Sequence, residues 1–255
     1  MNRFVYYSTN NVLKTIFVEK EEKFKSHKDP IFDSPFFDPK NRLQEFIELV
    51  RCSLKSEDKE NKFLVSLVQA TLSGKTRLIL EASMKNPIVL ISFKNTNDTY
   101  SLLLQSLSIH QTDSCSNFEQ REFHNRVIMI KVKLFILAYL EFTLLYQRHI
   151  VNSKLNWESV DRMKKIILFA LLMNGGNALV STIFMKHIDD LKVTKDNVAE
   201  LSKVIDNDFQ LITKALGSPW LAFDECHVPQ VYCHGFLFHS NYKNFAKVIG
   251  SFIIL

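Results

Sequence analysis

Two short polar runs, far apart in the 255-residue chain, carry side chains that could bind and activate a phosphate group. The first run is Gln69–Thr76, which ends in Gly74-Lys75-Thr76 and directly follows the apolar segment Phe63–Val68. Where a strand turns into a helix, the first backbone N–H groups of the helix point outward and attract an anion. A lysine and a hydroxyl at that turn add a positive charge and a metal ligand. The run therefore predicts a phosphate-binding loop.

The last three residues of this run match the Walker A pattern. That pattern predicts that Lys75 contacts the β- and γ-phosphates and that the Thr76 hydroxyl binds Mg²⁺. The pattern has glycine five residues before Gly74, where this chain has Gln69. Leu72 stands at a second position that is often glycine, and a leucine forced to a positive φ would be strained. These departures predict weakened or lost nucleotide binding.

The predicted nucleotide-binding residues are the loop and the arginine that follows it. They are Gln69, Ala70, Thr71, Leu72, Ser73, Gly74, Lys75, Thr76 and Arg77.

The second run is Asp224-Glu225, which directly follows the apolar segment Trp220–Phe223. A P-loop needs an acidic residue that holds magnesium and, for hydrolysis, a base that orients the attacking water. The end of a buried strand is where this Walker B pair belongs. We expect Asp224 to bind the metal together with Thr76, and Glu225 to act in catalysis together with Lys75. The predicted ligands are ATP and Mg²⁺.

The elements around the two runs predict an α/β fold, a three-layer P-loop NTPase core with a short parallel sheet. Buried strands are predicted at 63–68, 88–93 and 220–223, with a helix at Arg77–Lys85 between the first two. Strand, helix and strand in this order form a βαβ unit. Helical periodicity dominates from about 97 to 216, so a large helical segment is expected between the second and third strands, with one of its helices at 157–173. A further helix is expected at 234–248.

The glutamate beside the Walker B aspartate resembles a division of P-loop NTPases, and this resemblance implies a later strand between the phosphate-loop strand and the acidic strand. Ser251–Leu255 is the predicted inserted strand. The sequence ends before the polar sensor residue that normally follows such a strand. We therefore expect residues 61–255 to be a P-loop domain that is incomplete at its C-terminus. Residues 1–60 are expected to be a linker and helical lead-in.

Composition allows a folded protein with an anionic ligand. Hydrophobic residues make up 46% and charged residues 23%, and six Gly and six Pro argue against a turn-rich β fold. The net charge of +5 fits a small anion and is compatible with nucleic acid. The apolar stretches 127–146 and 166–184 are interrupted by polar residues, so buried helices are favoured over membrane spans. An intracellular protein without signal peptide or transmembrane segment is expected, in the cytoplasm or the nucleus.

Two other kinds of site have weaker support. A cysteine and histidine cluster could bind zinc, but its spacing is not that of a standard zinc knuckle. Dispersed basic residues on a predicted helix could face nucleic acid, but a solvated helix face explains them better. The cluster is Cys226, His227, Cys233, His234 and His239, and the basic residues are Arg121, Arg126, Lys131 and Lys133.

Both motifs resemble those of fungal and oomycete P-loop NTPases related to the Crinkler effectors and to mobile-element ATPases. Loops of that group often read Gln-Ser-Ser-Gly-x-Gly-Lys-Ser/Thr-Arg, and their acidic strand often reads Phe-Asp-Glu-Ala. The chain matches at Gln69, Gly74, Lys75, Thr76, Arg77 and Phe223-Asp224-Glu225, and departs at Ala70, Thr71, Leu72 and Cys226. The resemblance covers residues 60–255 and implies a STAND-like ATPase module. Such a module would switch a protein partner or a missing C-terminal domain.

Two alternatives stay open. Asp224-Glu225-Cys226-His227 also resembles the DEAD/DEAH box of superfamily-2 helicases, which implies a nucleic-acid-stimulated ATPase. The helical region between the motifs argues against it, because helicases carry nucleic-acid motifs on strands there. The other alternative is a decayed NTPase that serves as an interaction domain, which the departures at Gln69 and Leu72 favour.

Overall fold

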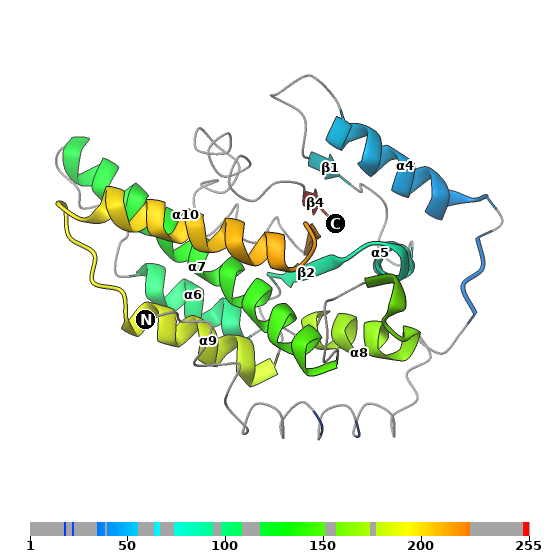
Figure 1. Cartoon of the computed structure of the whole chain (residues 1–255). Coiled ribbons are helices and arrows are strands. Elements are labelled where there is room, and N and C mark those ends of the chain that lie inside the picture. The colour runs from blue at the N-terminus through cyan, green and yellow to red at the C-terminus, as the bar shows by residue number, and fades with distance from the viewer. Residues whose placement is uncertain are drawn as a thin grey trace.

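The computed structural model describes residues 18, 22, 35–38, 40–55, 64–66, 74–93, 98–108, 118–150, 157–173, 177–224 and 252–254. Figure 1 shows their arrangement. The helices are α4 (Arg42–Lys55), α5 (Lys75–Lys85), α6 (Asp98–Ser108), α7 (Phe118–Ile150), the 3-10 turn η2 (Trp157–Ser159), α8 (Arg162–Met173), α9 (Asn177–Asp189) and α10 (Val198–Ala215). The strands are β1 (Leu64–Ser66), β2 (Ile88–Ser92), β3 (Trp220–Asp224) and β4 (Phe252–Ile254).

The four strands form one parallel sheet in the order β1-β4-β3-β2. The last strand of the chain therefore lies between the first and the third, which confirms the inserted strand predicted at 251–255. β2 and β3 are apolar on both faces, and Ile88–Ser92 and Trp220–Phe223 are buried throughout. Continuous apolar runs of this kind are typical of parallel strands covered on both sides.

The predicted helical segment lies between β2 and β3 and is observed as α6 to α10. α7 is the longest of these helices, with 33 residues, and packs against α6, α9, α10 and β2 (Figure 1). Its middle turns are buried on all sides. Phe135 of α7 stacks on Phe93 at the end of β2, with 5.5 Å between ring centroids, and Phe93 lies 5.9 Å from Phe223 of β3. The helical segment and the sheet thus share one core.

The helix predicted at 157–173 is divided into η2 and α8 in the structure. Asp161 separates them, and its side chain accepts a hydrogen bond from the backbone N–H of Met163 at 2.9 Å. Aspartate favours this N-cap role because its carboxylate satisfies an N–H that has no partner inside the helix. The helix predicted at 234–248 lies outside the described residues.

Two lysines of α7 correct the interpretation of its basic residues as a solvated face. Lys131 and Lys133 are buried, and each has a polar partner. Lys131 donates to the backbone carbonyl of Ser106, and Lys133 pairs with Asp206 of α10 at 2.6 Å. A polar partner offsets part of the free energy that burial of a charged group costs. Within the described ranges no single helix is long and apolar enough to cross a membrane, although the bent pair α8–α9 reaches that length and composition.

Candidate functional site

The chain enters α5 through a glycine in the left-handed region. Gly74 is the N-cap residue, with φ 82° and ψ 16° in the left-handed region. Its carbonyl accepts the first helical hydrogen bond, from the N–H of Leu78 at 2.9 Å. Only glycine adopts this backbone without strain, which explains the residue type at this position.

The first turn of α5 carries basic side chains, although the macrodipole already makes the N-terminal end of a helix positive. It contains Lys75 and Arg77 and has no acidic residue. Helices normally place Asp or Glu there, because the macrodipole and the unpaired N–H groups favour negative charge. Lys75, Thr76 and Arg77 are all half-buried. The turn is therefore suited to a bound anion.

Strand register places Asp224 at the same edge of the sheet as the end of β1. Ser66 at the end of β1 and Phe223 in β3 both pair with Ile254 of β4. Asp224 is one position beyond that row. Since neighbouring strands are spaced about 4.8 Å apart, the end of β1 and the end of β3 are separated by about 10 Å. In open parallel sheets, ligands bind at this carboxyl edge.

The backbone of Asp224 is fixed by its neighbour β2. Asp224 pairs with Ser92 in the ladder, and its carbonyl accepts a hydrogen bond from the N–H of Phe93 at 3.1 Å. The side chain is half-buried. A carboxylate held at the end of a rigid strand can bind a metal through water without reorganisation of the backbone.

The structure describes part of the predicted site. Gly74, Lys75, Thr76, Arg77 and Asp224 are described, and the first three begin one helix. The other predicted residues lie outside the described residues, and their roles stay predictions. They are Gln69, Ala70, Thr71, Leu72, Ser73 and Glu225, as well as the cysteine and histidine cluster that follows it.

Thr76 and Asp224, the predicted magnesium ligands, are among the described residues, whereas the predicted zinc cluster lies outside them. Among the described residues there is no group of three or more His, Cys, Asp or Glu side chains that could hold a metal. Mg²⁺ does not need such a group, because it keeps several waters and uses one or two carboxylates together with substrate phosphates. Thr76 and Asp224 would supply the two protein oxygens.

A buried carboxylate in α5 holds Arg77, which the sequence had assigned to the phosphates. Glu81 accepts from the Arg77 guanidinium at 2.8 Å and from the Arg162 guanidinium of α8 at 3.0 Å. The guanidinium of Arg77 also lies 5.9 Å from the ring centroid of Phe36. Sequence reasoning missed Glu81 and Arg162. The four-residue spacing of Arg77 and Glu81 is a helical ion-pair signal, whereas no local pattern points to Arg162.

The C-terminal end of α5 is tied to the helical segment by two more side chains. The indole N–H of Trp157 donates to the carbonyl of Ser83 at 2.8 Å, and the Lys165 ammonium donates to the carbonyl of Met84 at 2.9 Å. These carbonyls belong to the last turn, where no helical N–H can reach them. Lys165 also lies 5.2 Å from the centroid of the Trp157 ring. Burial lowers the pKa of Lys165, and Glu158 and Asp161 partly oppose that shift.

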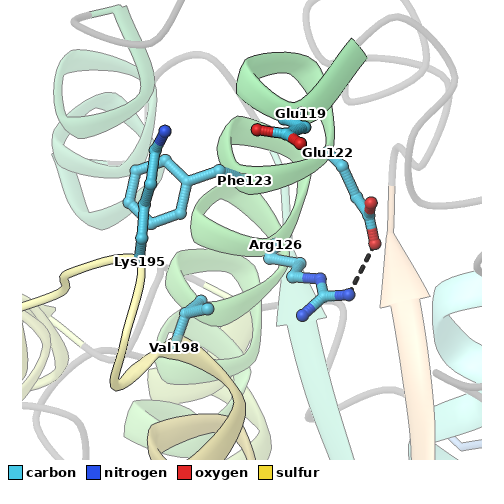
Figure 2. Close-up of a pocket in the computed structure, with 6 residues that line it drawn as sticks. All are labelled: Glu119, Glu122, Phe123, Arg126, Lys195 and Val198. Atoms are coloured by element: carbon cyan, nitrogen blue, oxygen red, sulfur yellow. Dashed lines mark hydrogen bonds and ion pairs between the residues drawn. The ribbon is translucent and has the colours of Figure 1, made fainter.

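Two cavities lie elsewhere and include neither Lys75 nor Asp224. The smaller, about 170 Å³, lies between the first turns of α7 and the start of α10, as Figure 2 shows. Its arginine, Arg126, is already paired with Glu122 at 2.5 Å. The larger, about 810 Å³, is an open groove between α6 and α9. The two cavities are separate from the candidate site at α5 and β3.

No protein-family model matches the chain, and no curated protein or solved structure matches it either. The resemblance to Crinkler-related ATPases and the P-loop NTPase core therefore stay predictions.

Proposed function

We propose that this chain is a P-loop module that binds ATP with Mg²⁺ and uses its hydrolysis as a regulatory switch. The observation that carries the proposal is the strand order β1-β4-β3-β2. The position of β4 between β1 and β3 is the one that the Asp224-Glu225 pair predicts. It supports a nucleotide site in which the helix after β1 and the end of β3 face one ligand.

Each described residue would have one role in binding. The first N–H groups of α5 and the Lys75 ammonium would neutralise the β- and γ-phosphate oxygens. The Thr76 hydroxyl and the Asp224 carboxylate would hold Mg²⁺, directly or through water. The metal would withdraw charge from the phosphates. Gly74 allows the chain to enter the helix in the left-handed conformation that brings these N–H groups outward.

Hydrolysis would need one further residue. Glu225 would accept a proton from a water whose oxygen attacks the γ-phosphorus, and the bond to the bridging oxygen of ADP would break. The proton would then leave with the released phosphate. The resemblance to STAND-like ATPases suggests that a protein partner or a C-terminal domain responds to this change of state.

Calorimetric titration with ATP and Mg²⁺ tests the proposal on a matched pair of variants. Lys75→Ala should weaken ATP binding at least about tenfold, because one charge-assisted contact to phosphate is lost. Lys85→Ala removes an exposed lysine from the last turn of the same helix and should leave the affinity unchanged. A folded wild-type chain that binds no ATP at millimolar concentration would refute the proposal and favour the decayed NTPase.

A further inference from the structure

Glu81 is a buried carboxylate with two arginine partners of different origin. Its side chain is 7% exposed. Arg77 reaches it from one turn earlier in α5, and Arg162 reaches it from α8. Arg162 contacts both carboxylate oxygens, with nitrogen–oxygen distances of 3.0 and 3.3 Å. We call Arg77, Glu81 and Arg162 the Glu81 triad.

The triad contains two positive charges and one negative charge. One arginine can therefore move away while the other still pairs with Glu81. A buried carboxylate that loses its last partner is strongly destabilised, but the bidentate contact of Arg162 prevents that. Arg162 is 56% exposed and contacts Glu81 from the surface of α8. Arg77 is the partner that can exchange.

Arg77 is also the partner that lies next to the phosphate site. It is the third residue of α5 and directly follows Thr76. Along the helix axis, with a rise of about 1.5 Å per residue, Glu81 lies about 6 Å towards the C-terminus and Lys75 lies about 3 Å towards the N-terminus. A long side chain in the middle can therefore turn either way. A bound anion would favour the turn towards the N-terminus, where a positive charge is otherwise unfavourable.

We propose that Arg77 exchanges between Glu81 and the phosphates of bound ATP, and that Arg162 is a positioning residue that holds Glu81 in both states. The inference rests on the proposed function and adds regulation to the same site. The exchange would couple α8 to ATP binding, because a movement of Arg162 would change the strength of the ion pair between Glu81 and Arg77.

The exchange predicts opposite effects for the two halves of one ion pair. Glu81→Gln removes the competitor for Arg77 and should tighten binding of ATP with Mg²⁺ about fivefold, whereas Arg162→Ala leaves Glu81 dependent on Arg77 and should weaken it about fivefold. The effect of Glu81→Gln should disappear when Arg77→Ala is added. Arg126→Ala breaks an exposed ion pair of the same four-residue spacing in α7 and should change nothing.

Calorimetric titration of the full chain, with circular dichroism as the test of folding, separates the outcomes. If Glu81→Gln and Arg162→Ala change the ATP affinity in the same direction, or if the Glu81→Gln effect persists with Arg77→Ala, the exchange is overturned while ATP binding stays in place. A folded wild type without ATP binding would overturn the proposed function itself. If Glu81→Gln does not fold, Arg162→Ala decides alone, since Arg162 is mostly exposed and Arg77 still pairs with Glu81. Weaker ATP binding would support the exchange, and unchanged or tighter binding would overturn it.

Discussion

The indole N–H of Trp157 donates to the carbonyl of Ser83 at 2.8 Å, although 74 positions separate the two residues. Through this bond the start of the η2–α8 segment caps the helix whose other end carries Lys75. Arg162 and Lys165 reach the same half of α5 from α8. The helical segment between β2 and β3 therefore anchors the candidate phosphate helix at its far end.

Trp157→Phe tests this anchor, because it keeps a ring in place and removes the donor. The Ser83 carbonyl would lose its indole partner in a buried position, which costs about 2 kcal/mol of unfolding free energy. Urea denaturation followed by circular dichroism measures the change. Trp157→Leu should cost more, since packing is lost as well. An unchanged midpoint for the phenylalanine variant would mean that the bond contributes nothing.

Gly74→Ala should reduce both stability and ATP affinity. An alanine at φ 82° costs about 1 kcal/mol through backbone strain, and relief of that strain would turn the first N–H groups of α5 away from the phosphates. Gly217→Ala is the matched control, because Gly217 has φ 76° at the end of α10. Denaturant unfolding should give similar losses for both variants, and calorimetry should give weaker ATP binding for Gly74→Ala alone. Equal affinity in the two variants would argue against phosphate binding at this turn.

The strands and helices were predictable because their signals are local. The apolar runs at Ile88–Ser92 and Trp220–Phe223 are bounded by Asn86-Pro87 and by Asp224, so strand type and bounds follow from the sequence. The position of β4 was not a local signal, and it followed from the resemblance of Asp224-Glu225 to the acidic pair of one division of P-loop NTPases. The division between η2 and α8 was missed, because the cap at Asp161 does not interrupt the apolar periodicity.

The contacts of the candidate site were predictable only where they are close in sequence. Gly74, Lys75 and Thr76 belong to one motif, and the fold keeps them on one turn. Arg162 and Glu81 are 81 positions apart, and nothing in either neighbourhood indicates the other. The burial of Lys131 was missed for the same reason, since its partner is a backbone carbonyl of another helix.

Lys131 should give stability a component that rises with pH. Burial lowers its pKa below 10.5 in the folded state, so between the folded and unfolded pKa values the unfolded chain binds more protons. The unfolding free energy therefore increases as the pH rises through the folded pKa towards 10.5. Lys131→Met should remove this component. Urea denaturation from pH 7 to pH 10 measures the unfolding free energy of the wild type and of Lys131→Met. The wild-type value should rise relative to the value of the variant as the pH increases. A difference between the two that stays constant with pH would contradict the lowered pKa of Lys131.

Asp224→Asn should remove most of the Mg²⁺ dependence of ATP binding. The amide keeps the shape of the side chain and loses the charge that attracts the metal, so the ratio of affinities with Mg²⁺ and with EDTA should fall about tenfold. Asp190→Asn, at an exposed position after α9, is the matched control. If both variants keep the wild-type ratio, the metal does not use Asp224.

Glu225→Gln should separate binding from turnover. A glutamine can still contact water but cannot accept its proton, so ATP hydrolysis should fall about a hundredfold or more while ATP affinity is kept. Phosphate release at saturating ATP measures this change, with and without single-stranded DNA or RNA at low salt. Stimulation by nucleic acid that weakens with salt would favour the helicase-like alternative, because contacts to a phosphate backbone are salt-sensitive. Equal turnover in the wild type and Glu225→Gln would leave ATP binding intact and remove Glu225 as the catalytic base.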